Sequence, residues 1–278
     1  MRMHCVTSSE FRGGDTQDRI DDCSPIRHVA ITPSHHRDQT NRLFRVPMMI
    51  PPDIEADTRA YYRARAGEYQ EWYQRQGRYA HGSDDDADWN RELETITQFV
   101  ESLSIGSVFE IASGTGWWSR VLARNNTVFA SDYAPEMLAE ACRHDTPAMP
   151  IYRCRADAYH LPLSTGSVDA CAFGFWLSHV PVSRAPAFIR EAARTVRPGG
   201  ELLVVDSRQD PKGGAADQHT GGPRVQQQLR RLNDGREYTI WKIYRTPADL
   251  RFLLNLTCRR VEVIQTDRFF IAARGTVV

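Results

Sequence analysis

A glycine-rich segment in the middle of the chain has the residue types best suited to ligand binding. Residues 108–116 read Val-Phe-Glu-Ile-Ala-Ser-Gly-Thr-Gly, so small residues follow directly on a short apolar run. Glycine tolerates backbone conformations that other residues avoid, and it lets a ligand approach the main chain closely. Gly114 and Gly116 therefore predict a binding loop between a strand and a helix. Open α/β sheets bind their ligands at this place, the carboxyl end of a strand.

Two nucleotide-binding patterns fit this loop poorly. A dinucleotide fingerprint places small residues as G-x-G-x-x-G/A, but here the third position is Ser119, behind two tryptophans that would crowd a pyrophosphate. A P-loop requires Gly-Lys-Ser/Thr, and that sequence does not follow. Two alternatives stay open: a nicotinamide-dependent oxidoreductase on a similar sheet, and a protein that binds a cofactor without catalysis.

The loop resembles the first motif of the class I S-adenosylmethionine-dependent methyltransferases, which runs acid–x–small–x–Gly–x–Gly. Glu110, Ala112, Gly114 and Gly116 occupy this motif, with alanine in place of the commoner glycine. More narrowly, the chain resembles bacterial small-molecule methyltransferases of the menaquinone-biosynthesis type, over about residues 58–278. The resemblance implies S-adenosylmethionine as cofactor and in-line methyl transfer to a small-molecule acceptor.

Later residues match further positions of this family in the same order. Asp132 follows the second predicted strand, where the resemblance implies an acid that accepts hydrogen bonds from the ribose; a helix cap is the structural alternative. Asp157 and Ala158 follow the third strand, where the resemblance implies contacts with the adenine. The full set implied for the cofactor is Glu110, Ala112, Ser113, Gly114, Gly116, Trp118, Asp132, Tyr133, Met137, Asp157, Ala158 and Phe175.

One histidine is a candidate general base. His179 follows the fourth predicted strand on the ligand side of the sheet, and an imidazole pKa near ~6.5 suits a base at neutral pH. A base is needed only if the acceptor must lose a proton. A structural histidine that holds the loop is an equal alternative. Glu110 is expected to organise the loop rather than to act as the base.

Aromatic residues predict the acceptor pocket and its lid. The candidates are Tyr62, Tyr69, Tyr73, Trp176, Trp241 and Tyr244. The first three fall at helical spacing and resemble the family's N-terminal lid helix, although amphipathic packing would give the same pattern. The aromatic content favours an apolar or aromatic acceptor, or a cationic group held by cation–π contacts.

Alternating strands and helices position these residues. From residue 106 onward, apolar runs predict strands that alternate with helices, at residues 107–111, 127–131, 150–155, 168–175 and 201–205. With the resemblance, this pattern predicts a Rossmann-like, doubly wound α/β fold. We expect a mostly parallel seven-stranded sheet with an antiparallel last strand, preceded by N-terminal lid helices. Residues 207–245 are expected to form an inserted lid, with a short helix at 225–232.

Composition narrows the class of protein. The 278 residues contain 35 Lys plus Arg and 35 Asp plus Glu, and this balance argues against a nucleic-acid acceptor. No apolar run reaches the ~18 residues of a membrane span. The start lacks an apolar leader and no cysteines form a C-x-x-C pair, so a cytoplasmic location is expected. The oligomeric state is left open.

The organisation of the chain follows from these patterns. Residues 1–50 are expected to be a disordered or loosely attached extension, or an over-long start. Residues 51–105 are expected to form a helical lid, and residues 106–278 the catalytic domain. No metal site is expected, because the possible zinc ligands match no standard spacing: Cys5, Cys23, His28 and His35 or His36.

Overall fold

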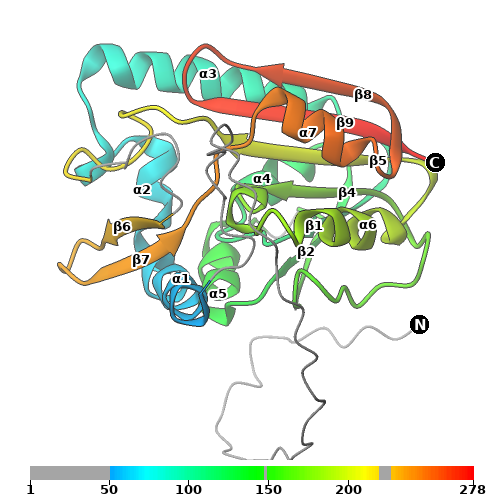
Figure 1. Ribbon diagram of the computed structural model, residues 1–278, viewed down its shortest axis with the longest axis horizontal. Helices are drawn as coiled ribbons and strands as arrows, with labels where there is room; N and C mark the ends of the chain where they lie inside the picture. The colour runs from blue at the N-terminus through cyan, green and yellow to red at the C-terminus, as the bar shows by residue number, and fades with distance from the viewer. Residues whose placement is uncertain (1–50, 147–148, 219–226) are drawn as a thin grey trace, which may run out of the picture. The chain divides into compact units, whose positions relative to one another are not determined.

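The computed structural model describes residues 51–146, 149–218 and 227–278, and a seven-stranded sheet dominates them (Figure 1). The strand order is β3-β2-β1-β4-β5-β9-β8, and β9 is antiparallel to both neighbours. The other neighbouring pairs, from β3 to β5, are parallel. The predicted Rossmann-like sheet with an antiparallel last strand is therefore confirmed. The strands are β1 Ser107–Ile111, β2 Thr127–Asp132, β3 Ile151–Arg155, β4 Val168–Gly174, β5 Val196–Ser207, β8 Cys258–Gln265 and β9 Phe270–Val277.

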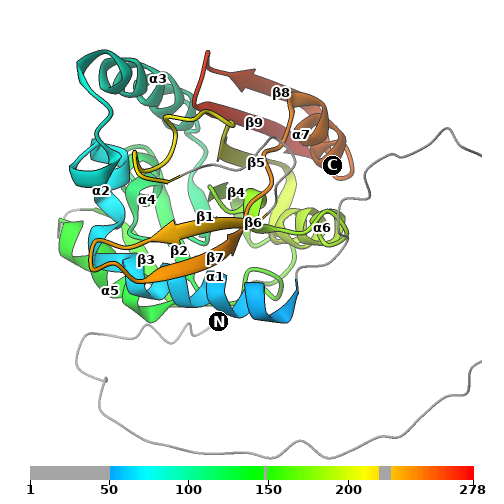
Figure 2. The same cartoon turned by 60° about the vertical axis from the view of Figure 1, so that its left-hand side comes forward.

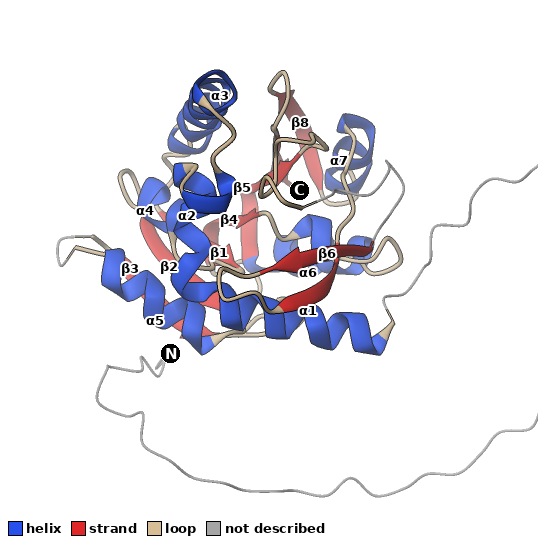
Figure 3. Cartoon of the chain, turned by 90° about the vertical axis from the view of Figure 1, so that its left-hand side faces the viewer, coloured by secondary structure: helices blue, strands red, loops and turns tan. Residues whose placement is uncertain are grey.

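Helices cover both faces of this sheet because its strands are apolar on both sides. Strand side chains alternate between faces, and Phe109 belongs to one buried cluster whereas its neighbour Val108 belongs to another. The Phe109 cluster includes residues of α6 and α7, and the Val108 cluster includes residues of α3 and α4 (Figure 3). The helices are α3 Ser83–Glu101, α4 Trp117–Leu122, α5 Pro135–His144, α6 Ala185–Thr195 and α7 Pro247–Leu254.

The segment before the sheet is helical, as the tyrosine spacing predicts. It contains α1 Pro52–Arg65, a 3₁₀ turn at Ala66–Glu68, α2 Tyr69–Gln74 and a second 3₁₀ turn at Gly77–Tyr79. Helix α1 lies along a separate two-stranded ribbon and buries Tyr61 against Leu232 and Ile240 (Figure 2). Within the described ranges, no helix is long and apolar enough to cross a membrane.

The predicted short helix at 225–232 is wrong. In the part of this range that the structure describes, β6 Gln227–Arg231 pairs antiparallel with β7 Glu237–Trp241. The physical reason is the turn Asn233-Asp234-Gly235, in which Gly235 adopts φ +89°. A glycine at positive φ after Asn or Asp is typical of a hairpin connection, and the polar strand residues hid this signal.

The register of the sheet brings the strand-end loops together. Ile111 at the end of β1 is paired with Ser131 on β2 and with Phe173 on β4. Because these strands are parallel, the loops that follow them start side by side at one edge of the sheet. This edge carries the predicted ligand-binding residues.

Candidate functional site

A cavity of about 140 Å³ lies at the carboxyl ends of strands β1 to β4. The loops after all four strands contribute to its walls, as the glycine-loop argument predicts. The residues from these loops are Ala112, Gly114, Tyr133, Ala134, Met137, Ala156, Asp157, Ala158, Gly174, Phe175 and Trp176. The fold thus brings together much of the predicted cofactor set, and we call this space the strand-end cavity.

The main chain of the first loop is shaped to approach a ligand. Gly114 has φ +54°, and a Cβ atom placed on it would meet nothing within 4 Å, so its backbone faces open space. Ala112 has φ +52°, a conformation that L side chains rarely adopt. Backbone held in this way is typical of ligand-binding loops. The alanine that departs from the commoner glycine therefore still takes a glycine-like conformation.

Asp132 ties the first two loops to each other. Its carboxylate accepts the backbone N–H of Gly114 at 2.9 Å and that of Ala134 at 2.8 Å. Burial raises the pKa of this carboxyl, and hydrogen bonds from the backbone of Ala134, Gly114 and Tyr133 oppose the shift. An ionised carboxylate can accept about four hydrogen bonds, so it can still accept one from a further donor. Its contact with a ribose stays a prediction.

Asp157 presents its carboxylate at the far wall of the cavity. One oxygen accepts the backbone N–H of Tyr159 at 2.9 Å, and the side chain is about 46% exposed. The loop is closed by a backbone hydrogen bond from His160 to the carbonyl of Asp157. The second carboxylate oxygen lies 3.7 Å from His160 Nδ1. The contact of Asp157 and Ala158 with an adenine stays a prediction.

Four other predicted cofactor residues lie in or beneath the loop and do not line the strand-end cavity. Glu110 is buried and accepts a hydrogen bond from the Ser119 hydroxyl, and burial raises its pKa to about 7. Trp118 shares a small separate cavity with Glu110. Ser113 donates its backbone N–H to Ser131 at 2.8 Å, and Gly116 caps α4 with φ +74°. Their contact with a cofactor stays a prediction.

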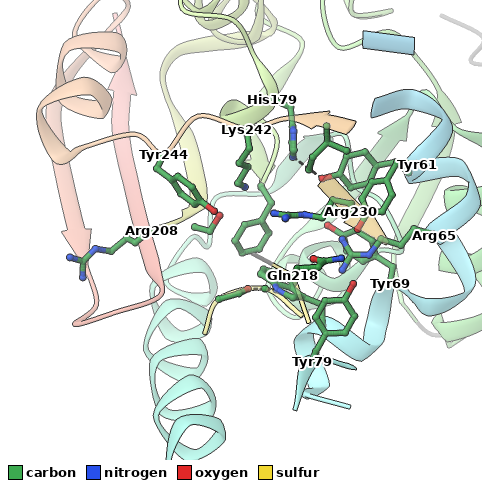
Figure 4. A pocket seen from close by; sticks show the side chains of 17 residues that line it. Tyr61, Arg65, Tyr69, Tyr79, His179, Arg208, Gln218, Arg230, Lys242 and Tyr244 are labelled. Carbon is green, nitrogen blue, oxygen red and sulfur yellow. Dashed lines mark hydrogen bonds between the residues drawn. The ribbon is translucent and has the colours of Figure 1, made fainter. Parts of the chain in front are cut away.

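A second cavity, shown in Figure 4, shares part of its lining with the first. Both cavities are lined by Tyr62, Tyr69, Phe175 and His179. The remaining walls of the second come from α1, the β6–β7 ribbon and the chain after β5. We call it the ribbon cavity, and its shared wall is the place where two bound molecules would meet.

The predicted acceptor residues divide between these cavities and the core. Besides the shared Tyr62 and Tyr69, Trp176 lines the strand-end cavity and Tyr244 lines the ribbon cavity. Tyr73 instead stacks on Trp117, with ring centroids 4.2 Å apart and planes 2° from parallel. The Trp241 side chain is buried, and only its carbonyl reaches the site. Amphipathic packing therefore accounts for the position of Tyr73.

His179 is held by two hydrogen bonds in the short 3₁₀ turn Leu177–His179. Its Nδ1 lies 2.5 Å from the Trp241 carbonyl, which can only accept, so Nδ1 carries the proton. Nε2 is then the acceptor for the Tyr62 hydroxyl, 2.7 Å away. Burial, and then the charge of Lys242, lower the pKa of His179 well below its usual value. The imidazole is neutral at pH 7.

The ribbon cavity also contains cationic residues that the sequence did not single out as charged ligands. Arg65, Arg208, Arg230 and Lys242 line it, together with several tyrosines. The positive charges disfavour a cationic acceptor, whereas the apolar or aromatic acceptor stays a prediction because aromatic rings share this lining. Sequence did carry a signal: Arg65 follows Tyr61 by four residues, so it falls on the helix face that is otherwise apolar.

Metal ligands do not cluster in the described parts of the chain. Across residues 51–146, 149–218 and 227–278, no three His, Cys, Asp or Glu side chains are grouped so as to hold an ion. The possible zinc ligands between Cys5 and His36, and the predicted extension 1–50, lie outside the described residues.

Comparison with known sequences points to one enzyme class. Residues 108–200 match a family model described as a methyltransferase domain. The demethylmenaquinone methyltransferase of Mycolicibacterium vanbaalenii is 32% identical over 119 residues, which cover 42% of this chain and 48% of that protein. The Beutenbergia cavernae protein of the same name is 36% identical over 105 residues, covering 37% and 42%. The chain thus spans about half the length of the curated relatives it matches.

Solved structures extend the similarity along the chain. The structure named "DhpI-SAM-HEP complex" is 30% identical, with a TM-score of 0.62, and the match covers 81% of this chain and 99% of that one. The structure named "DhpI-SAH complex structure" is 29% identical, with a TM-score of 0.61 and coverage of 82% and 98%. These structural matches cover a much larger part of the chain than residues 108–200, which match the family model.

Proposed function

Because this chain belongs to the class I S-adenosylmethionine-dependent methyltransferases, we propose that it methylates a small-molecule acceptor with S-adenosylmethionine as the methyl donor. The observation that carries the proposal is the meeting of two cavities at Tyr62, Tyr69, Phe175 and His179. One cavity is built from strand-end loops, where α/β sheets bind cofactors. The other gives a second molecule access to the same wall. The solved neighbours named with SAM and SAH support this assignment.

The strand-end cavity has the donors and acceptors that this cofactor needs. Gly114 offers open backbone, and Asp157 lines the cavity and is assigned to the adenine amino group. Asp132 does not itself line the cavity; it lies behind Gly114, and its remaining acceptor capacity is assigned to the ribose. Met137 and Tyr133 add apolar surface. We assign the cofactor to this cavity and the acceptor to the ribbon cavity.

Bound S-adenosylmethionine would supply a methyl group on a positively charged sulfur. The residues of this chain then have three tasks: to bind both partners, to align them, and to exclude water. Alignment can lower such a barrier by ~7–11 kcal/mol. The rings of the shared wall, of which Phe175 and His179 are buried and Tyr62 and Tyr69 partly buried, are assigned to exclude water. Helix α1 with the ribbon is assigned as the lid over the acceptor. The assigned lid thus takes α1 from the helical segment 51–105 and the ribbon from the segment 207–245, both of which the sequence predicts as lids.

Tyr62 and His179 form the proposed proton route for an acceptor that must lose one. The neutral His179 Nε2 accepts a hydrogen bond from the Tyr62 hydroxyl. When the Tyr62 oxygen takes a proton from the acceptor, the hydroxyl proton that Tyr62 already carries can pass to Nε2. The Trp241 carbonyl stabilises the imidazolium that results, because it accepts from Nδ1. The same contacts hold the loop after β4. His179 therefore acts both as a structural residue and as the proposed base.

The acceptor is proposed to be a small molecule rather than a nucleic acid. The curated relatives are named for a quinone-type substrate, demethylmenaquinone, and the chain has no net charge. The cytoplasmic location expected from the sequence belongs to this proposal, as does the catalytic domain 106–278.

Calorimetric titration with S-adenosylhomocysteine tests the cofactor directly, with NADH as the control ligand. We expect binding of S-adenosylhomocysteine alone. Binding of NADH alone would return the chain to the oxidoreductase alternative. Binding of S-adenosylhomocysteine without methyl transfer to any acceptor in a broad screen would leave a cofactor-binding protein without catalysis.

A substitution at Asp132 makes this test specific to the site. Asp132→Asn removes one anionic oxygen and weakens the link between the two loops, so affinity for S-adenosylhomocysteine should fall about tenfold or more. Glu136→Gln is the matched control, because Glu136 is an exposed carboxylate four residues away. Equal affinity of both variants would contradict the role assigned to Asp132.

A further inference from the structure

We propose that the acceptor carries a doubly charged oxyanion, a phosphonate or a phosphate monoester, which Arg65, Arg230 and Lys242 bind in the ribbon cavity. This inference rests on the proposed function and names the substrate class of the same site. It begins from the charge of the lining. Among the described residues, four cationic side chains line the cavity and no Asp or Glu does. A cavity with this excess of positive charge attracts anions.

Three of the four cations are placed to contact a ligand. In Figure 4 the side chains of Arg230 and Lys242 reach toward the middle of the cavity, and Arg65 lies beside them among the tyrosines. Arg208 lies at the side, and its guanidinium donates to the backbone carbonyls of Thr266 and Asp267, the latter at 2.6 Å. Arg208 is therefore a structural residue of the wall.

Arg65 is the strongest indication of an anion-binding site. It is 7% exposed, and among the described residues its buried Nε and Nη2 atoms have no hydrogen-bond partner. Its guanidinium carbon lies over the rings of Tyr69, Tyr79 and Tyr61, at 4.5, 5.2 and 5.5 Å from their centroids. Ring faces satisfy the positive charge in part, but they leave the N–H groups unpaired. Unpaired buried donors are costly, and an oxyanion would satisfy them.

The aromatic contacts also fix the orientation of this guanidinium. Rings packed on Arg65 hold its flat group in place, so its donors are presented as a fork. Such a fork matches the oxygens of a phosphate, phosphonate or carboxylate. The Tyr61 hydroxyl is also buried beside this guanidinium, and burial raises its pKa, so it stays a proton donor at neutral pH.

The charge count favours a dianion over a monoanion. Lys242 donates to the Ser178 hydroxyl at 2.7 Å and lies 3.4 Å from the buried carboxylate of Asp206, which balances its charge. No ion pair within 4.0 Å joins Arg65 or Arg230 to a carboxylate in the described residues. Among the described residues, Arg230 donates to the Gln228 amide oxygen and, at 3.5 Å, to the Leu229 carbonyl. Two positive charges thus have no carboxylate within ion-pair distance in this part of the chain, and the Glu68 carboxylate acts on Arg65 from farther away.

The position of the cavity ties this anion to methyl transfer. Its wall includes Tyr62 and His179, which also line the strand-end cavity assigned to the cofactor. An acceptor held by its oxyanion at the arginines would lie against that shared wall. A neutral or cationic acceptor of the same size would leave both arginine charges unpaired, and so would bind more weakly.

The test is calorimetry on the full-length protein saturated with S-adenosylhomocysteine, using methylphosphonate, methyl phosphate, acetate and ethanol as probes at pH 9, where both phosphorus probes are dianions. We expect both dianions to bind, acetate to bind at least about tenfold more weakly than they do, and ethanol not to bind. If one dianion binds more tightly, its group, the phosphonate or the phosphate ester, is the one that the acceptor carries. Acetate bound as tightly as either dianion would overturn the charge count.

Matched variants on strand β6 locate the site. Arg230→Gln should weaken binding of the preferred dianion about tenfold or more without changing the affinity for S-adenosylhomocysteine. Arg231→Gln is the control, because Arg231 is the next residue on the strand, is exposed, and does not line the cavity. Arg65→Lys keeps the charge but removes the fork, so it should also weaken binding while preserving the fold. Dianion binding that Arg230→Gln leaves unchanged would overturn the assignment.

The two proposals fail in different ways. Loss of S-adenosylhomocysteine binding in the unmodified protein would contradict the proposed function before any anion is added. Retained S-adenosylhomocysteine binding with no response to either dianion would contradict the oxyanion inference alone.

Discussion

At the scale of single residues, Glu110 shows how burial can determine the behaviour of a motif residue. It is the acid that begins the glycine-loop motif, yet its side chain is 1% exposed. Its pKa is raised to about 7, first by burial, while the Ser119 hydroxyl and the charge of Arg153 oppose the shift only in part. The carboxyl is therefore a buried support for α4 and the loop, and it titrates near neutral pH.

This shift predicts a pH dependence of stability that a single substitution should remove. Between the ordinary pKa of about 4.5 and the raised value of about 7, the folded state binds more protons than the unfolded state. The free energy of unfolding therefore falls as pH rises through this window and levels off above it. The total is ~3 kcal/mol at ~1.4 kcal/mol per pKa unit. The free energy of unfolding of Glu110→Gln minus that of the unmodified protein should therefore rise by about this amount from pH 4.5 to pH 8.

Urea denaturation of both proteins at several pH values measures this difference. Glutamine can still accept the Ser119 hydroxyl, so the local hydrogen bond is kept. Glu94→Gln serves as the control, because Glu94 is exposed on α3. The difference in unfolding free energy between Glu94→Gln and the unmodified protein should not change with pH. A flat difference for Glu110→Gln as well would show that Glu110 is not buried as described.

At the scale of elements, the sequence predicted those whose signals are local. The strands around the glycine loop are predicted by short apolar runs. The start of α7 is predicted by Thr246-Pro247. Strand β6 and the cations of the ribbon cavity were missed because their roles depend on distant partners. Arg65 on α1 and Arg230 on β6 share a cavity only after the ribbon packs on α1. Spacing along the chain does not encode that contact.

Helix α7 offers a prediction about such a local signal. The Thr246 hydroxyl accepts the backbone N–H of Asp249 at 3.1 Å, and the Asp249 carboxylate accepts the backbone N–H of Thr246 at 2.8 Å. Thr246→Ala breaks this capping box and should lower the free energy of unfolding by ~1 kcal/mol. Thr95→Ala, the same change in the exposed interior of α3, should instead be neutral or stabilising within ~0.5 kcal/mol. Equal losses in denaturant titrations would contradict the capping role.

At the scale of the whole described molecule, residues 51–105 share a core with the sheet despite their proposed role as a lid. The Trp89 ring of α3 lies 4.6 Å from the Phe270 ring and 5.1 Å from the Phe269 ring, between ring centroids. The buried carboxylate of Glu92 accepts backbone N–H groups of Arg268 and Phe269 at the turn before β9. Helix α3 is therefore part of the sheet's own core. Helix α1 and the ribbon are joined by a smaller cluster around Tyr61.

This difference predicts which parts open together. Segments that share one core unfold as a unit, whereas a two-stranded ribbon is marginal by itself. In hydrogen exchange measured by mass spectrometry, α3 should exchange as slowly as β9. Helix α1 and β6–β7 should exchange faster, and S-adenosylhomocysteine should slow them because Tyr62 and Tyr69 also line the strand-end cavity. If α3 opened with α1 and ahead of β9, residues 51–105 would be one mobile lid. The contacts of Trp89 and Glu92 would then have to be weaker than their burial implies.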